Sequence, residues 1–142
     1  MENMDFNKNN LGEWNKVNAN SLMGNLGIEY LKVEAGYVVG RMPVDHRTKQ
    51  PFGQLHGGAT LALIETMAGV GSSFIIDLEH FEPRGINISA NLLRSVEEGF
   101  VYCHGTIINK GERSHLWKFE VKDDEDNLIA YAQFTVVVVA KK

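Results

Sequence analysis

The chain has 142 residues, a net charge of −4 and a sequence pI near 5.7. This length suits one domain with a sizeable core. The acidic balance and the lack of a basic stripe interleaved with aromatic residues argue against a nucleic-acid-binding surface. The single cysteine, Cys103, cannot form an internal disulfide, and neither a signal peptide nor a membrane-spanning apolar run is visible. We therefore expect a cytoplasmic protein without membrane or nucleic-acid partners.

The N-terminal part divides into a tail and a hairpin. Residues 1–20 are interpreted as a fraying tail followed by a short helix, which extends over about Leu11–Leu22. The remaining residues, 21–142, are interpreted as one domain. Its first two β-leaning runs, Ile28–Glu34 and Tyr37–Val44, are separated by Ala35 and Gly36, which is typical of a hairpin turn.

A single carboxylate stands out in the middle of the chain. The run Ala59–Ile76 follows directly on His56-Gly57-Gly58 and is apolar almost throughout, with Glu65 as its one charged residue. A helix of this composition would be largely buried, and burying an ionised glutamate without a partner is costly. Glu65 should therefore reach a polar cavity or a subunit boundary, or serve a reaction that needs a shielded carboxylate. The alternative is a purely structural role, in which Glu65 lies at an interface and pairs with a basic residue.

Beyond Pro83 the sequence consists of segments in which apolar and polar residues alternate, and short polar turns separate these segments. Four strands are predicted: Gly85–Arg94, Phe100–Ile108, Ser114–Lys122 and Leu128–Val139. Together with the first hairpin they predict an α+β fold, in which six antiparallel strands form a curved sheet wrapped around one long central helix.

The order of these elements, and above all the string MPVDHRTKQPFGQLHGG over residues 42–58 leading to Glu65, resembles the hotdog-fold acyl-CoA thioesterases. The likeness is greatest to the bacterial group acting on aroyl-CoA esters, which includes the 1,4-dihydroxy-2-naphthoyl-CoA and enterobactin-synthesis thioesterases. It extends over about residues 22–139. The resemblance implies hydrolysis of acyl-CoA, with an aromatic acyl group, and a homo-oligomer that is a dimer or a dimer of dimers. It implies no metal and no cofactor beyond the CoA of the substrate.

The residues themselves suggest how a thioester could be activated. The first N–H groups of a helix have no intrahelical partner, and glycine leaves them unshielded, so Gly57 N–H is the candidate for polarising the carbonyl. Glu65 lies seven residues after Gly58, close to two helical turns, and so falls on the same face. The resemblance implies that Glu65 is the catalytic carboxylate, as nucleophile through a mixed anhydride or as general base to water. Both roles remain open.

Further positions match functional residues of the family. The resemblance implies that Gln50 lies beside the thioester carbonyl across the subunit interface and that His56 orders the turn that begins the helix. Capping or core packing is the alternative for His56.

The resemblance implies three more positions that contact the substrate. Thr66 and Ser73 carry hydroxyls near or beyond the site, and relatives often have serine at the position of Thr66, where a hydroxyl could hydrogen-bond the substrate or Glu65. Arg94 matches a basic residue that binds the CoA nucleotide in relatives, where a guanidinium fork pairs well with phosphate. One departure concerns Leu92, where close relatives often carry histidine. The alternative for Arg94 is an ordinary exposed residue at the end of a strand.

Two competing functions remain. A hotdog hydratase or dehydratase would act on similar thioesters, but its usual pairing of Asp and His is not seen in the expected form. A non-catalytic acyl-CoA-binding module would keep the fold without turnover, although Glu65, Gln50 and His56 together count against it. Metal binding and cysteine catalysis are not expected, because Cys103 has no neighbouring base and the remaining histidines lack metal-ligand spacing. Those histidines are His46, His80, His104 and His115.

Overall fold

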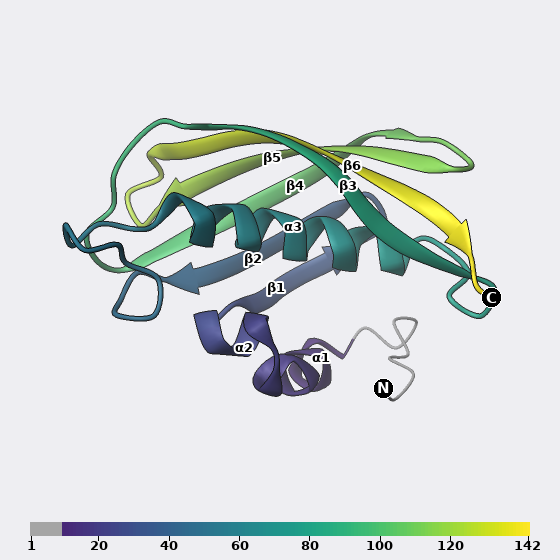
Figure 1. Ribbon diagram of the computed structural model, residues 1–142, viewed down its shortest axis with the longest axis horizontal. Coiled ribbons are helices and arrows are strands. Elements are labelled where there is room, and N and C mark those ends of the chain that lie inside the picture. The colour runs from purple at the N-terminus through teal and green to yellow at the C-terminus, as the bar shows by residue number, and fades with distance from the viewer. Residues whose placement is uncertain (1–9) are drawn as a thin grey trace.

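The computed structural model of the protein, which describes residues 10–142, has one long helix lying across a curved antiparallel sheet (Figure 1). The helix is α3 (Gly57–Phe74). The strands are β1 (Glu29–Glu34), β2 (Tyr37–Pro43), β3 (Phe81–Leu92), β4 (Phe100–Lys110), β5 (Ser114–Asp123) and β6 (Leu128–Ala140). They are arranged in the order β1-β2-β4-β5-β6-β3, with each neighbouring pair antiparallel. The predicted α+β hotdog architecture is confirmed.

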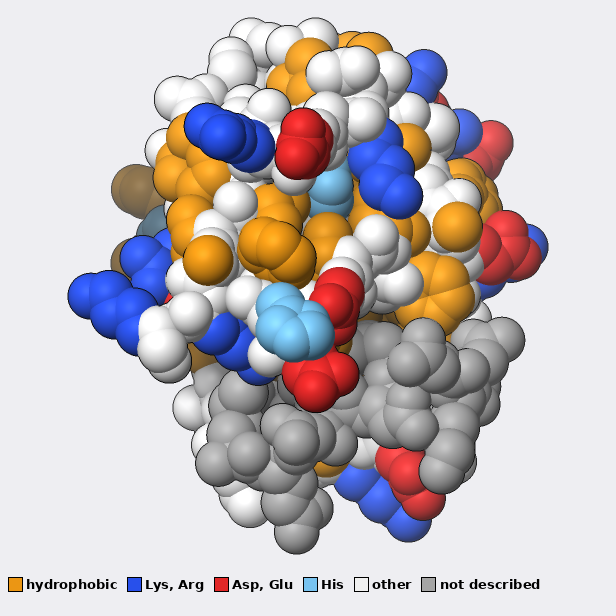
Figure 2. Space-filling model, turned by 90° about the vertical axis from the view of Figure 1, so that its right-hand side faces the viewer, with side chains coloured by type: hydrophobic (Ala, Val, Ile, Leu, Met, Phe, Trp, Pro, Cys, Tyr) orange, Lys and Arg blue, Asp and Glu red, His pale blue; other side chains and the backbone are white. Residues whose placement is uncertain are grey.

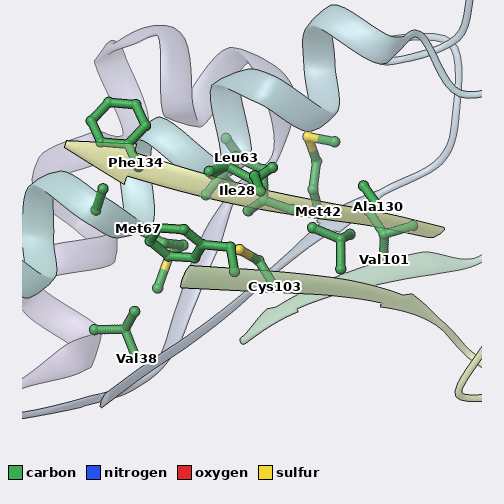
Figure 3. Close-up of a cluster of buried hydrophobic side chains, with 14 of the residues drawn as sticks. Ile28, Val38, Met42, Leu63, Met67, Val101, Cys103, Ala130 and Phe134 are labelled. Atoms are coloured by element: carbon green, nitrogen blue, oxygen red, sulfur yellow. The ribbon is translucent and has the colours of Figure 1, made fainter. Parts of the chain in front are cut away.

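The core lies between α3 and the concave face of the sheet. Figure 3 shows its apolar side chains, among them Leu63 and Met67 of α3 and Val101 of β4, all fully buried. Trp117 and Phe119 of β5 are also fully buried, and their rings stack with centroids 6.0 Å apart. Gly71 allows the helix to approach them, because a Cβ at this position would lie 2.7 Å from Cη2 of Trp117. Each such large side chain contributes about 1.5 to 3 kcal/mol by burial.

The helix predicted over Leu11–Leu22 is broken into three pieces, so that prediction was wrong in its extent. α1 (Leu11–Val17) continues into the 3₁₀ turn η2 (Asn18–Asn20), and α2 (Leu22–Leu26) follows. The break occurs because Ser21 is extended, with φ −124° and ψ 178°. The fraying predicted for residues 1–10 concerns residues that, apart from Asn10, lie outside those described. Among residues 10–142, no helix is both long and apolar enough to cross a membrane.

Strand β3 begins at Phe81, earlier than the predicted start at Gly85, and passes straight through Pro83. The prediction treated this proline as a boundary. Proline lacks an N–H and is tolerated on an edge strand, and β3 pairs with β6 on one side and with no strand of the described chain on the other. The strand ends at Leu92, so Arg94 lies just beyond it.

The two edges of the sheet differ in how they are protected. Beside β1, the Asn15 side chain of α1 satisfies one residue of the edge: Tyr30 N–H donates to Asn15 Oδ1 at 2.8 Å, and Asn15 Nδ2 donates to Tyr30 O at 3.2 Å. No other part of the described chain covers the free edge of β3 along its 12 residues in this way, and the strand exposes 60% of Ile86 at a register shift. Because a long apolar edge invites pairing with another strand, β3 is the edge suited to association.

Candidate active site

Helix α3 keeps one face open along its length. The opposite face packs on the sheet, whereas residues at helical spacing on the open face are exposed or half-buried. These are Gly58, Ala62, Glu65, Thr66, Gly69 and Ser73. The helix was predicted to be largely buried, but Glu65 is exposed in the single chain and makes no ion pair or hydrogen bond within residues 10–142. The subunit boundary expected at Glu65 stays a prediction. The sheet wraps only one side of the helix, so an apolar sequence did not ensure burial.

The Glu65 carboxylate lies against the open edge strand. Its Oε1 is 3.8 Å from the position that a Cβ at Gly85 would occupy. That same Cβ would meet the Phe134 ring at 2.6 Å. A side chain at residue 85 would thus clash with Phe134, and it would lie in ordinary contact with the Glu65 carboxylate.

His56 forms the N-cap of α3. Its ring Nδ1 accepts a hydrogen bond from Gly58 N–H at 2.8 Å, and the backbone N–H of His56 donates to Thr48 O at 2.8 Å. The ring therefore holds the turn through Nδ1, which leaves only Nε2 for any proton transfer. No hydrogen bond connects His56 to Glu65.

The N–H of Gly57 is the free donor of this turn: within the described chain no acceptor lies in hydrogen-bonding reach of it. Leu92, at the end of β3, packs directly on this glycine, since its Cδ1 is 2.5 Å from the position of a Cβ at Gly57. Any side chain at residue 57 would have to displace Leu92. The helix start and the end of the edge strand are thus in contact.

A groove of about 250 Å³ opens at this contact and connects Gly57 with Arg94. Its wall includes Leu92 and Leu93, which are 54% and 56% exposed. Arg94 is exposed and forms no ion pair among residues 10–142, so its guanidinium is available to an anion. The structure thus brings together the residues predicted for the carbonyl and for the nucleotide.

The other predicted residues have local partners. The Gln50 side chain accepts from Phe52 N–H within the turn 50–54, and no hydrogen bond links it to Glu65. Thr66 Oγ1 donates to Ala62 O at 2.7 Å and Ser73 Oγ donates to Gly69 O at 2.8 Å. The suggested hydrogen bond between Thr66 and Glu65 is therefore not formed, and both hydroxyls keep only their acceptor lone pairs for a ligand.

Glu65 and Gly57 are too far apart to act together within one chain. They are eight residues apart on one helix, which corresponds to roughly 12 Å along its axis. A donor that stabilises an oxyanion must lie about 3 Å from that oxygen, and an attacking group must be equally close to the carbonyl carbon. The helix face predicted from the sequence to carry both residues is present, but the two residues are separated along it.

Two clusters escaped the sequence analysis because their members are distant in the chain or exposed in a turn. Asp77, Glu79 and His80 precede β3 and bring potential metal-ligand atoms within 4.8 Å of one another, with His80 Nδ1 2.6 Å from Asp77 Oδ2. Ser72 and His115 meet in the core, with His115 Nδ1 2.8 Å from Ser72 Oγ. No spacing in the sequence signals the second contact, which joins a helix to a strand.

Cys103 has no catalytic environment. It is fully buried in β4, and burial raises the pKa of its thiol well above the ordinary value. A thiol held in this way stays protonated at neutral pH and is a poor nucleophile.

Comparison with known proteins gives the same class as the fold. The sequence pattern of the thioesterase superfamily matches residues 52–130, and the chain belongs to this family of thioester hydrolases. A thioesterase from Haemophilus influenzae superposes with a TM-score of 0.87 at 36% identity, covering 92% of this chain and 91% of that one. A variant of a thioesterase from Pseudomonas aeruginosa superposes with a TM-score of 0.90 at 31% identity, covering 93% and 95%.

A curated relative adds a substrate to the comparison, for that relative alone. The 1,4-dihydroxy-2-naphthoyl-CoA hydrolase of Escherichia coli is 32% identical over 125 residues, which are 88% of this chain and 91% of the relative. The predicted hotdog thioesterase family is therefore confirmed. Hydrolysis of thioesters is also the activity that distinguishes this family from the hydratase and the non-catalytic binding module considered above.

Proposed function

We propose that this thioester hydrolase acts on acyl-CoA as a dimer or a dimer of dimers, with Glu65 of one subunit and Gly57 N–H of the other acting on the same carbonyl. The observation that carries the proposal is the separation of these two groups by roughly 12 Å within one chain. Each group nevertheless lies beside the same open edge strand, Glu65 at Gly85 and Gly57 at Leu92.

A two-fold pairing of β3 with its copy would bring Glu65 of one chain to Gly57 of the other. In an isologous antiparallel pair, a register that sets Gly85 opposite Leu92 of the partner subunit also sets Leu92 opposite Gly85 of the partner subunit. Glu65 of one chain then faces the helix start of the other, twice in each dimer. The neighbouring turn 50–54 of the second chain would bring Gln50 toward the same carbonyl.

The chemistry follows from these positions. With Glu65 as general base, water attacks the carbonyl carbon, the carboxylate takes the water proton, and Gly57 N–H stabilises the oxyanion. Collapse of the tetrahedral intermediate breaks the C–S bond, and the proton passes from Glu65 to the departing thiolate. In the alternative, Glu65 itself displaces the thiolate to form a mixed anhydride, which water then hydrolyses. His56 keeps the donor turn in shape in both cases, and acceptor lone pairs of Thr66 and Ser73 face the substrate side of the helix.

The groove between Gly57 and Arg94 supports CoA as the carrier of the acyl group. The Arg94 guanidinium would pair with a nucleotide phosphate, while Leu92 and Leu93 flank the pantetheine arm. An aromatic acyl group is proposed from the likeness to the Escherichia coli hydrolase. The reaction needs no metal or cofactor besides the CoA of the substrate.

The direct test is release of free CoA thiol from a panel of aromatic and aliphatic acyl-CoA esters by the wild type and by Glu65→Gln. The amide keeps the shape of the side chain but cannot attack or accept a proton, so turnover should fall by several powers of ten. Glu34→Gln, at an exposed position on β1, is the matched control. Near-wild-type turnover in a folded Glu65→Gln protein would remove this carboxylate from the mechanism.

The shared site has its own test. Mixing inactive Gln50→Ala with inactive Glu65→Gln should restore part of the activity, because some mixed dimers contain one pocket with both native residues. In parallel, Ser89→Cys at the middle of the proposed β3 pairing should give a covalent dimer with a short thiol cross-linker, whereas Lys32→Cys on β1 should not. Full activity in a protein that remains monomeric would contradict the shared site but not thioester hydrolysis.

A further inference from the structure

A second pocket lies at the C-terminal end of α3, away from the helix start. It has a volume of about 600 Å³ and lies among Ile75, Ile76, Phe81 and Val138. Figure 2 shows this end of the molecule, where apolar side chains gather and charged side chains stand around them. Pockets that hold small organic ligands have this combination of size, apolar walls and a few polar groups.

The buried polar side chain in its wall is His115, which is only 1% exposed. Its Nδ1 is 2.8 Å from Ser72 Oγ, and the same oxygen accepts a hydrogen bond from Trp117 Nε1 at 2.9 Å. Within residues 10–142 the Ser72 hydroxyl has no other acceptor for its single hydrogen, so it donates to His115 Nδ1. The neutral ring therefore carries its proton on Nε2.

This Nε2–H has no partner in the described chain, yet it is not sealed in the core. The one fully buried side-chain nitrogen or oxygen left without a partner among residues 10–142 is Asn18 Nδ2. His115 is not in this position, because its side chain borders the pocket. A buried donor is thus held in a fixed direction by two hydrogen bonds and lacks an acceptor.

The charges at the pocket indicate what that acceptor is. Lys110 and Arg113 line the pocket, and neither forms an ion pair within residues 10–142. Two carboxylates also line it, Glu112 and Asp77, and Asp77 Oδ2 is already engaged by His80 Nδ1 at 2.6 Å. The formal charges of the lining therefore balance, and it is the two cations without ion-pair partners and the N–H donor that an anion would satisfy.

We propose that this pocket is a second ligand site, which binds a small carboxylic acid with an apolar body. The carboxylate accepts the His115 Nε2–H and lies near Lys110 and Arg113, while its apolar body packs against Ile75, Phe81 and Val138. The site does not depend on the proposed hydrolysis: Ile75 follows Glu65 by ten residues, roughly 15 Å along the helix. The tail of a thioester acyl group would leave the His115 donor unused.

The test is titration of the protein, labelled with ¹⁵N at its tryptophan side chains, with benzoate. The Trp117 indole N–H shares Ser72 Oγ with His115, so its resonance should shift saturably, while that of Trp14 on α1 should not. Benzyl alcohol, which has the same ring without the charge, should bind about ten-fold more weakly or worse. If benzoate and benzyl alcohol bound with equal affinity, the pocket would not recognise the carboxylate, and the proposal would be overturned.

Two histidine variants separate the donor from the fold. In His115→Asn the side-chain amide replaces Nδ1 toward Ser72 and removes the Nε2 donor, so the fold should persist and benzoate binding should weaken about ten-fold or more. In His115→Gln the amide instead replaces Nε2 and leaves Ser72 without its partner, so part of the binding should return at lower stability. Unchanged benzoate affinity in folded His115→Asn would contradict the proposed contact.

A substitution at an exposed position of the pocket tests the site without disturbing the core. Ala140→Phe adds a ring at an exposed position of the pocket lining and should block benzoate, whereas Ala35→Phe in the turn between β1 and β2 should not. Glu65→Gln should leave the benzoate titration unchanged. Loss of the Trp117 shift in Glu65→Gln would mean that benzoate binds at the hydrolytic site, which would overturn the second site and leave the proposed function intact.

Discussion

The Glu65 carboxylate lies 3.8 Å from the point at which a side chain at Gly85 would begin. One residue belongs to the open face of the central helix and the other to the unpaired edge of the sheet. The carboxylate is therefore exposed in the single chain and lies beside the strand edge at which the proposed dimer forms. A glycine is favoured at residue 85 by a different contact, because a Cβ there would lie 2.6 Å from the Phe134 ring.

Gly69 offers the simplest test of the open face of α3. It is in the helix one turn after Glu65, and a Cβ there would meet nothing within 4 Å. Gly69→Ala should therefore raise the free energy of unfolding by about 0.5 to 1 kcal/mol, since alanine is the better helix former. Urea denaturation measures this, with Gly85→Ala as the opposite case that should destabilise by about 1 to 3 kcal/mol through the clash with Phe134. A less stable Gly69→Ala would show that this position is covered.

Arg94 should affect binding of the nucleotide and not the chemical step. A charge-assisted contact with phosphate is worth about 1.5 to 3 kcal/mol, so Arg94→Ala should raise KM for acyl-CoA by about ten-fold or more with kcat nearly unchanged. A pantetheine thioester, which lacks the nucleotide, should be indifferent to the substitution. Lys118→Ala is the control, because Lys118 is also an exposed cation but lies on β5. An equal rise in KM for both substrates would mean that Arg94 supports the fold and does not bind the nucleotide.

Acid should destabilise the protein in two separate steps. Burial lowers the pKa of His115 below its ordinary value of 6.5, with a further contribution from Lys110; burial and then Lys122 do the same for His104. Below pH 6.5 the unfolded chain therefore binds more protons than the folded one, so these groups contribute their full stability above pH 6.5 and lose it on acidification. Asp45, whose pKa Arg47 lowers to about 2, loses its contribution only below its ordinary value of 3.8.

Urea midpoints measured between pH 7 and pH 5 check the first step, a range chosen to span the ordinary histidine pKa of about 6.5. In His115→Asn the fall in stability over this range should be smaller than in the wild type, because the buried imidazole is gone. A wild-type midpoint independent of pH over this range would contradict the lowered pKa values of both histidines.

Asn15 should protect the second edge of the sheet. Asn15→Ala removes both hydrogen bonds to the Tyr30 backbone and should cost about 1 to 3 kcal/mol of unfolding free energy. It should also promote association through the newly open β1 edge, which light scattering would detect. Asn109→Ala, on β4, is the matched control, because that side chain makes no hydrogen bond within the described chain. If Asn15→Ala were as stable as the wild type and associated no more than it does, Asn15 would not be what protects the β1 edge.

The sequence by itself determined the fold class and the family. Alternation of apolar residues and short turns predicted six strands, and the string over residues 42–58 indicated the thioesterases. It also indicated that Glu65 and the His56-Gly57-Gly58 turn share a helix, since local spacing is sufficient for that.

The tertiary structure alone decided which face of this helix is open. A run that is apolar around most of its circumference has no periodic signal to mark a solvent side, so the sequence predicted a largely buried helix and did not show that Glu65 lies on an exposed face. Contacts between distant segments were equally invisible: Leu92 on Gly57, Asn15 on the edge of β1, and His115 on Ser72. These contacts depend on how the sheet curves around the helix, which is a property of packing between elements and not of the sequence within any one of them.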